Sequence, residues 1–135
     1  MILRKNKITI YRSKKPDHET VNEELQWFCD SLGLFGERDK DKSCFRMFVV
    51  LLKSLHTSSG MTSDEISDHV GLSRGTVVHH LHRLIGSGIV IQDQNKYMIR
   101  VNNLSSLIEE VERDILRTME ELRQAADDID KRLEL

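Results

Sequence analysis

Apolar residues in the first third of the chain recur at helical spacing in two segments. From Thr20 to Leu32 they fall at intervals of four, three and four residues, which predicts an amphipathic helix that buries Val21, Leu25, Phe28 and Leu32. Ser43 is the expected N-cap of a second helix running through His56, with a buried face of Phe45, Phe48, Val49, Leu52 and Leu55. A charged loop at residues 33–42 is expected to join the two helices.

A different period precedes the first helix. Residues 7–12 (KITIYR) alternate polar and apolar side chains, with Ile8 and Ile10 on one face, and therefore predict a short strand. The sequence Lys-Pro-Asp at 15–17 is expected to end it.

The pattern between residues 62 and 101 predicts two short helices and then two strands. Thr62 to Glu65 place a capping hydroxyl and acidic side chains at the start of the first helix, whose Ile66 and Val70 face inward. Gly71 supplies the turn with a positive φ, and Ser73 caps the second helix, which runs to about residue 85. The Gly-Ser-Gly at 86–88 ends that helix, and strands follow at 89–91 and 96–101 around a turn at 93–95.

The last segment, residues 104–133, predicts one long helix without glycine or proline. Its apolar residues recur every seven positions in two offset frames, although Thr118 interrupts the second frame. Such spacing is typical of a coiled-coil seam, and a helix of about 45 Å exceeds what a small domain covers. We therefore expect dimerisation with an identical chain, in a parallel or an antiparallel arrangement, through Leu104, Ile108, Val111, Ile115, Leu122, Ala125 and Ile129.

Composition and charge limit the class of protein. The chain is 39% hydrophobic and 31% charged, which is typical of a globular protein. No apolar run approaches the roughly 20 residues that cross a bilayer, and the N-terminus lacks the features of a signal peptide, so a cytoplasmic location is expected. Cys29 and Cys44 are too few for a disulfide framework; they serve either as small buried hydrophobes or as a redox pair.

The net charge of −2 conceals an uneven distribution. Residues 1–16 carry six basic side chains and no acid, whereas residues 104–135 carry ten acids against five bases. Residues 61–101 balance four acids with four bases, so a local nucleic-acid surface is compatible with the overall acidity. The basic N-terminus either adds phosphate or minor-groove contacts, or is a disordered or sheet-extending start.

Three histidines, His79, His80 and His82, lie within four positions of the second short helix and suggest either a metal site or a DNA-reading face. His79 and His82 could face one ion, but His80 points about 100° away from His79, and zinc sites usually need three or four protein ligands. If Val77, Leu81 and Leu84 face the core, the outward face presents Arg74, Gly75, Val78, His79, His82 and Arg83. That face suits a DNA major groove, and no metal or other cofactor is predicted.

The run from Met61 to Val90, followed by IQDQNKYMIRV, resembles the winged helix-turn-helix of prokaryotic ArsR- and MarR-type transcriptional regulators. The matching positions form the turn, the recognition helix and the entry to the wing: Ile66, Val70, Gly71, Leu72, Ser73, Thr76, Val77, His80, Leu81, Leu84, Gly88, Ile89 and Val90. The resemblance implies a mainly α fold with a small β-wing, with residues 73–85 in the major groove and the wing at 89–101 on the adjacent backbone. His80 matches a core-edge histidine of these families. The chain has no cysteine after Cys44 and no histidine after His82, so it lacks the ligands typical of metal-sensing members.

Together these patterns predict three regions: an N-terminal arm and amphipathic helix at 1–42, a winged helix-turn-helix at 43–102, and a coiled-coil helix at 103–135. The residues expected to contact DNA are Thr62, Ser63, Ser73, Arg74, Gly75, Thr76, Val78, His79, His82, Arg83, Gln94, Asn95 and Lys96.

The predicted function is a homodimeric regulator, acting as a repressor, that binds specific double-stranded DNA; an unidentified small-molecule or protein effector is the candidate modulator. The alternative is a winged-helix adaptor of the transcription machinery that docks a protein partner through the acidic coiled coil. No nucleophile elbow, phosphate loop or pair of catalytic carboxylates is found, so an enzyme is not expected.

Overall fold

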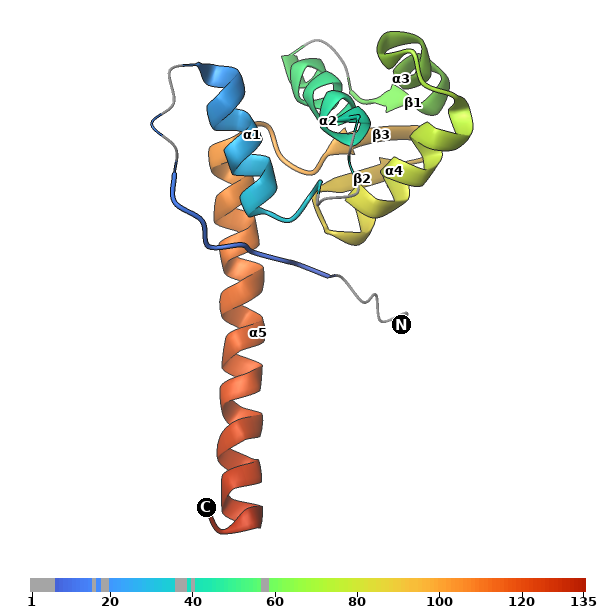
Figure 1. Cartoon of the computed structure of the whole chain (residues 1–135). Coiled ribbons are helices and arrows are strands. Elements are labelled where there is room, and N and C mark those ends of the chain that lie inside the picture. The colour runs from blue at the N-terminus through green and yellow to red at the C-terminus, as the bar shows by residue number, and fades with distance from the viewer. Residues whose placement is uncertain (1–6, 16, 18–19, 36–38, 40, 57–58) are drawn as a thin grey trace. The chain divides into compact units, whose positions relative to one another are not determined.

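The computed structural model describes residues 7–15, 17, 20–35, 39, 41–56 and 59–135. The chain divides into two compact units, Met1–Arg100 and Val101–Leu135. Figure 1 shows the helices between residues 43 and 86 of the first unit gathered around a small sheet, and the second unit mainly as a single long helix. This confirms the predicted class of fold, and the three-part division into 1–42, 43–102 and 103–135 stays a prediction.

Within the described residues, the first unit contains four α-helices and a three-stranded sheet. The helices are α1 (Val21–Ser31), α2 (Ser43–Lys53), α3 (Ser63–Val70) and α4 (Arg74–Gly86), with a short 3₁₀ turn at Ser54–His56 after α2. The strands are β1 (Met61–Thr62), β2 (Val90–Asp93) and β3 (Lys96–Ile99), arranged antiparallel in the order β1-β3-β2. The sequence pattern did not predict β1, because two residues are too short to show an alternation.

The core of the first unit lies between α2, α3, α4 and the sheet. Met47, Phe48 and Leu51 of α2 are fully buried, as are Ile66 of α3 and Leu81 of α4. The buried face of α2 is therefore rotated from the prediction: Phe45 and Phe48 are buried, but Val49, Leu52 and Leu55 are only half-buried. On α1, Cys29 is buried and Val21 is 83% exposed, which corrects the predicted inner face of that helix.

The loop before α2 is more than a charged connection. Leu34 and Phe35 are buried, and the Phe35 ring lies edge-on to Phe45 and Phe48 at centroid distances of 5.5 and 6.0 Å. Asp39 is also buried, and its carboxylate accepts hydrogen bonds from the backbone N–H groups of Cys44 and Phe45. The predicted cap is therefore wrong: Lys42 occupies the N-cap position, and the aspartate supplies the acceptor that Ser43 was expected to provide.

The N-terminal arm, residues 7–15, forms no strand, which corrects the prediction for residues 7–12. Its backbone forms hydrogen bonds with the last residues of two helices. The Lys7 N–H donates to the carbonyl of Gly86 in α4, and the Tyr11 N–H donates to the carbonyl of Ser31 in α1. Ile8 and Ile10 are exposed rather than packed on a sheet face. The alternation therefore reflects an extended segment that pairs with carbonyls left free where helices end. Residues 1–6 and 16, which complete the predicted basic arm and its break, lie outside the described residues.

The second unit consists mainly of α5 (Leu104–Leu133), with the predicted bounds. Asn103 caps it by accepting a hydrogen bond from the Ser106 N–H. Leu107 and Val111 are buried, whereas every residue from Leu116 to Leu135 is exposed. Of the predicted seam residues, Val111 is buried and Leu104 and Ile115 are half-buried, whereas Ile108, Leu122 and Ile129 are exposed by 36, 56 and 51%. The stripe is therefore uncovered mainly in the C-terminal half of α5 in this single chain.

Candidate nucleic-acid interface

Helix α4 is anchored by one face and exposed on the other. Val77, Leu81 and Leu84 have 0, 0 and 1% of their surface exposed, which confirms the predicted inner face. The opposite face presents Arg74, Gly75, His79 and His82 as exposed residues and Thr76, Val78 and Arg83 as half-buried ones. Because the inner face is held by three aliphatic side chains, the outer face has a defined orientation.

Hydrogen bonds stabilise α3 and the turn that joins it to α4. Thr62 and Glu65 form the expected capping box at the start of α3, with the Glu65 N–H donating to the Thr62 hydroxyl at 3.1 Å. Gly71 adopts a φ of 69° and ends α3. The Ser67 hydroxyl donates to the Leu72 carbonyl, and the Arg46 guanidinium donates to the Val70 carbonyl at 3.2 Å. These bonds hold α4 at one angle to α3, as a helix-turn-helix requires.

The N-terminus of α4 carries the cap predicted for it. Ser73 accepts a hydrogen bond from the Thr76 N–H at 3.2 Å, and its hydroxyl donates to that of Thr76 at 2.9 Å. Arg74 follows on the surface, with its guanidinium 3.6 Å from the carboxylate of Asp64 on α3. Both side chains are more than 70% exposed, so this ion pair is weak and screened by salt. The ion pair favours one orientation of the guanidinium but does not fix it.

The wing, defined here as β2, β3 and the turn between them, confirms the predicted hairpin, although β2 covers residues 90–93 instead of 89–91 and the turn is shorter than the predicted 93–95. Asp93 and Lys96 are paired in register, so Gln94 and Asn95 form a two-residue turn, with Gln94 at a φ of 57°. The strands begin at Val90 and end at Ile99, where 89 and 101 were predicted. Gln94 and Asn95 are exposed at the tip and Lys96 is half-buried beside them.

Thr62 and Ser63 were predicted to contact DNA, and the structure places both as half-buried residues at the start of α3. The Thr62 hydroxyl is already an acceptor within the capping box. Their contact with DNA is untested, as are the contacts of the residues on α4 and the wing.

His80 lies on the inner side of the histidine cluster. It is buried, and its Nε2 lies 2.8 Å from the Ser43 hydroxyl, which in turn lies 3.5 Å from Asp39 Oδ1. His80 Nδ1 is buried without a hydrogen-bond partner among the described residues. We infer that Nε2 carries the proton and donates to Ser43, because an unpaired acceptor at Nδ1 costs less than an unpaired N–H. The residue therefore joins α4 to α2, and its ring centroid lies 5.8 Å from that of His79.

Burial lowers the pKa of His80 below its usual 6.5, and Arg83 and His79 lower it further, while Asp39 and Asp41 oppose the shift. The folded protein therefore binds fewer protons than the unfolded chain as the pH falls below about 6.5. We expect the free energy of unfolding to decrease with falling pH, by up to about 1.4 kcal/mol per pH unit, until the folded-state pKa is reached.

Chemical denaturation of the wild type and of His80→Gln between pH 7.5 and 5 measures this dependence. The glutamine variant keeps a donor for Ser43 but does not titrate, so its stability should change less with pH. His82→Gln, at an exposed position of the same helix, is the matched control and should behave like the wild type. Equal pH dependence in His80→Gln and the wild type would contradict the assignment.

No group of three or more metal-ligating side chains forms a cluster within the described part of the chain. Cys29 and Cys44 are both buried free thiols, and burial raises the pKa of Cys29 and raises that of Cys44 to about 12. Burial favours the neutral thiol at both positions, which agrees with the prediction that these cysteines are small core hydrophobes. None of the described helices is long and apolar enough to span a bilayer.

Comparison with known proteins finds one family match, which covers the helix-turn-helix. Residues 49–92 match the family model described as bacterial regulatory protein, arsR family, a segment that runs from α2 through α3 and α4 into β2. The solved structure of the ST1889 protein from the thermoacidophilic archaeon Sulfolobus tokodaii is similar at 29% sequence identity, over 69% of this chain and 97% of that chain, with a TM-score of 0.37. No curated protein matches the chain.

The winged helix-turn-helix and the family match support a DNA-binding transcription regulator as the class of this protein. Its recognised segment is similar to that of the arsR family of bacterial regulatory proteins.

Proposed function

We propose that this regulator binds specific double-stranded DNA as a homodimer and represses transcription, with α4 in the major groove and the wing on the adjacent backbone. The observation that carries the proposal is the outer face of α4, where Arg74, Gly75 and His79 are exposed while the inner face is buried. A helix presented in this way fits the width of the major groove of B-DNA.

Gly75 is the residue of this face that most specifically suggests a close contact with DNA. A Cβ added at this position would meet no atom within 4 Å, so packing within the described chain does not require glycine. Glycine inside a helix costs about 1 kcal/mol relative to alanine. We infer that glycine is present here despite its cost to helix stability, because a phosphate or base edge must approach the backbone closely at this point.

The neighbouring residues have roles that follow from their chemistry. Arg74 can bridge the O6 and N7 atoms of guanine, His79 can donate or accept at a base edge, and Val78 can contact a thymine methyl group. His82 and Arg83 lie one turn further along and suit phosphates, as does Lys96 on the wing. The amides at the Ser73 end of α4 favour a phosphate as well.

The proposed dimerisation depends on the stripe of exposed apolar side chains on α5. From Leu116 onward the helix is exposed in the single chain, yet Leu122, Ile129 and Leu133 repeat apolar positions that a partner helix would cover. Two copies would place two α4 helices on half-sites about 34 Å apart, on one side of the duplex.

The function is tested by selecting genomic fragments with the purified protein and then comparing Gly75→Ala with Gly86→Ala on the recovered duplex. A Cβ at Gly86, the last residue of α4, also meets open space, so it is a matched control. Gly75→Ala should raise the free energy of unfolding by about 0.5–1 kcal/mol and still weaken DNA binding about tenfold, a loss of about 1.4 kcal/mol. Gly86→Ala should leave DNA binding unchanged.

Full binding by Gly75→Ala would show that α4 does not approach DNA at this residue. Failure to retain any duplex at low salt, together with capture of a defined protein by α5, would select the adaptor function instead. Recovery of a palindrome with half-sites one helical turn apart would support the homodimer.

A further inference from the structure

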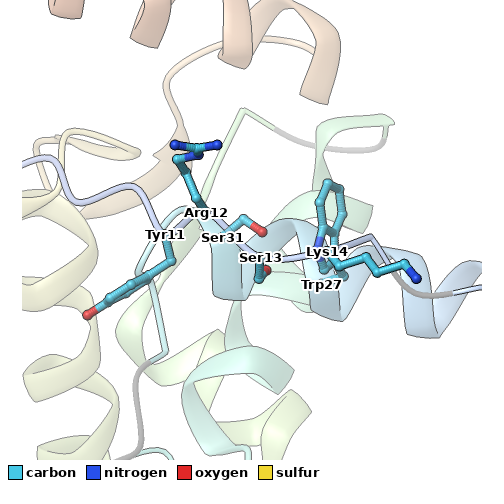
Figure 2. A pocket seen from close by; sticks show the side chains of 6 residues that line it. All are labelled: Tyr11, Arg12, Ser13, Lys14, Trp27 and Ser31. Atoms are coloured by element: carbon cyan, nitrogen blue, oxygen red, sulfur yellow. The ribbon is translucent and has the colours of Figure 1, made fainter.

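A hollow of about 640 Å³ lies where the N-terminal arm passes over α1. It is lined by six residues of the first unit: Tyr11, Arg12, Ser13, Lys14, Trp27 and Ser31. The Tyr11 N–H donates to the Ser31 carbonyl at 2.8 Å, which holds the arm against the end of α1. Figure 2 shows the arm side chains spread out from one extended segment, with Trp27 and Ser31 contributed by the helix.

Two buried polar atoms of this hollow lack partners. Trp27 Nε1 and Ser31 Oγ make no hydrogen bond, and only one other buried side-chain nitrogen or oxygen of the described residues, on His80, shares that state. An unpaired buried donor is costly, and a native structure that keeps one commonly uses it for a ligand or water. Because residues 27 and 31 are one helical turn apart, both atoms belong to the same side of α1.

The residues that line the hollow favour a negatively charged ligand. Arg12 and Lys14 bring two positive charges, no carboxylate lines the hollow, and every polar side chain there can donate a hydrogen bond. The rings of Trp27 and Tyr11 add flat apolar surface, on which a planar group can stack. Such a site selects an anion whose body is apolar rather than a fully hydrated ion.

We propose that the hollow is a binding site for a small organic anion, namely a carboxylate attached to a flat apolar body. The carboxylate pairs with Arg12 and Lys14 and accepts from Trp27 Nε1 or Ser31 Oγ once the exposed arm side chains shift to admit it. The proposal goes beyond the proposed function, because the site shares no residue with the outer face of α4 or the wing. Its test therefore succeeds or fails independently of DNA binding.

The tryptophan at position 27 is the single one in the chain, so its fluorescence reports on this site directly. Benzoate is the probe, titrated at constant ionic strength with excitation near 295 nm, a wavelength that selects indole. A ligand of this size should bind with a dissociation constant on the order of 1 mM. Benzamide, which keeps the ring but not the charge, should bind at least about tenfold more weakly, since it forms no charge-assisted bond.

The variants Arg12→Gln and Lys14→Gln should each weaken benzoate binding about fivefold, with the indole environment retained. Lys53→Gln removes an exposed cation from the end of α2 and should leave benzoate binding unchanged. Calorimetry with Trp27→Phe, which keeps a ring but removes Nε1, should show weaker binding as well.

Three results would overturn the proposal: no saturable response to benzoate, equal responses to benzoate and benzamide, or equal affinity for inorganic phosphate. The last would indicate a site for phosphate, such as that of a nucleic-acid backbone. Loss of DNA binding in Gly75→Ala has no bearing on any of them.

Discussion

The double substitution Leu122→Glu and Ile129→Glu is expected to convert the protein to a monomer and to lower its affinity for a palindromic duplex by at least about 100-fold. Both side chains are about half-exposed in the single chain and lie seven residues apart on the apolar stripe of α5. A partner helix would bury them, and a glutamate in that seam would have to be desolvated. Without the dimer, each half-site is bound separately and the gain from linking two sites is lost.

A control for the added charge is available on the same helix. Gln124→Glu and Lys131→Gln together lower the net charge by the same two units, at positions seven residues apart on the opposite face of α5. This variant should remain dimeric. Light scattering measures the mass and a gel-shift titration the affinity. A wild type that is monomeric at micromolar concentration, or a double glutamate variant that remains dimeric, would contradict the dimer.

Arg74→Ala is expected to weaken binding to the preferred duplex by about 1–3 kcal/mol for each half-site while leaving binding to unrelated duplexes nearly unchanged. The reason is that a guanidinium bridging a guanine edge contributes mostly to discrimination between bases. The ion pair with Asp64 in the free protein lowers the gain only slightly, because both groups are exposed to solvent.

Lys96→Ala removes the same charge from the wing and serves as the comparison. It should weaken all duplexes by a similar factor and reduce the slope of log affinity against log salt by about two units per dimer, as expected for one phosphate contact in each half-site. Titrations of both variants against the preferred and a scrambled duplex at several salt concentrations separate the two roles. If Arg74→Ala and Lys96→Ala have the same effect on both duplexes, Arg74 does not read a base.

Local sequence signals predicted the helix-turn-helix well. The capping box at Thr62, the positive φ of Gly71 and the cap at Ser73 each depend on residues within four positions of one another, and all three are present. The same holds for the inner face of α4, because the helical period places Val77, Leu81 and Leu84 on one side. The two-residue turn at Gln94 and Asn95 is likewise a short-range feature.

The errors lie where a distant partner decides the outcome. Whether residues 7–12 form a strand depended on a neighbouring strand, and the arm meets the ends of α4 and α1 instead. Phe35 and Asp39 look like parts of a polar loop in sequence, but α2 provides the rings and the amide groups that bury them. The short strand β1 exists only because β3 lies beside it.

The sequence alone therefore determined that this protein contains a helix-turn-helix, which way α4 faces, and that a long amphipathic helix follows the wing, since each depends on periodicity and on caps within one turn. The tertiary structure decided which polar atoms are buried together: the contact of His80 with Ser43, whose hydroxyl also contacts Asp39, and the pairing of the arm with α1, where Trp27 Nε1 and Ser31 Oγ are unsatisfied. These contacts join residues far apart in the chain, and no local pattern encodes which of them will meet.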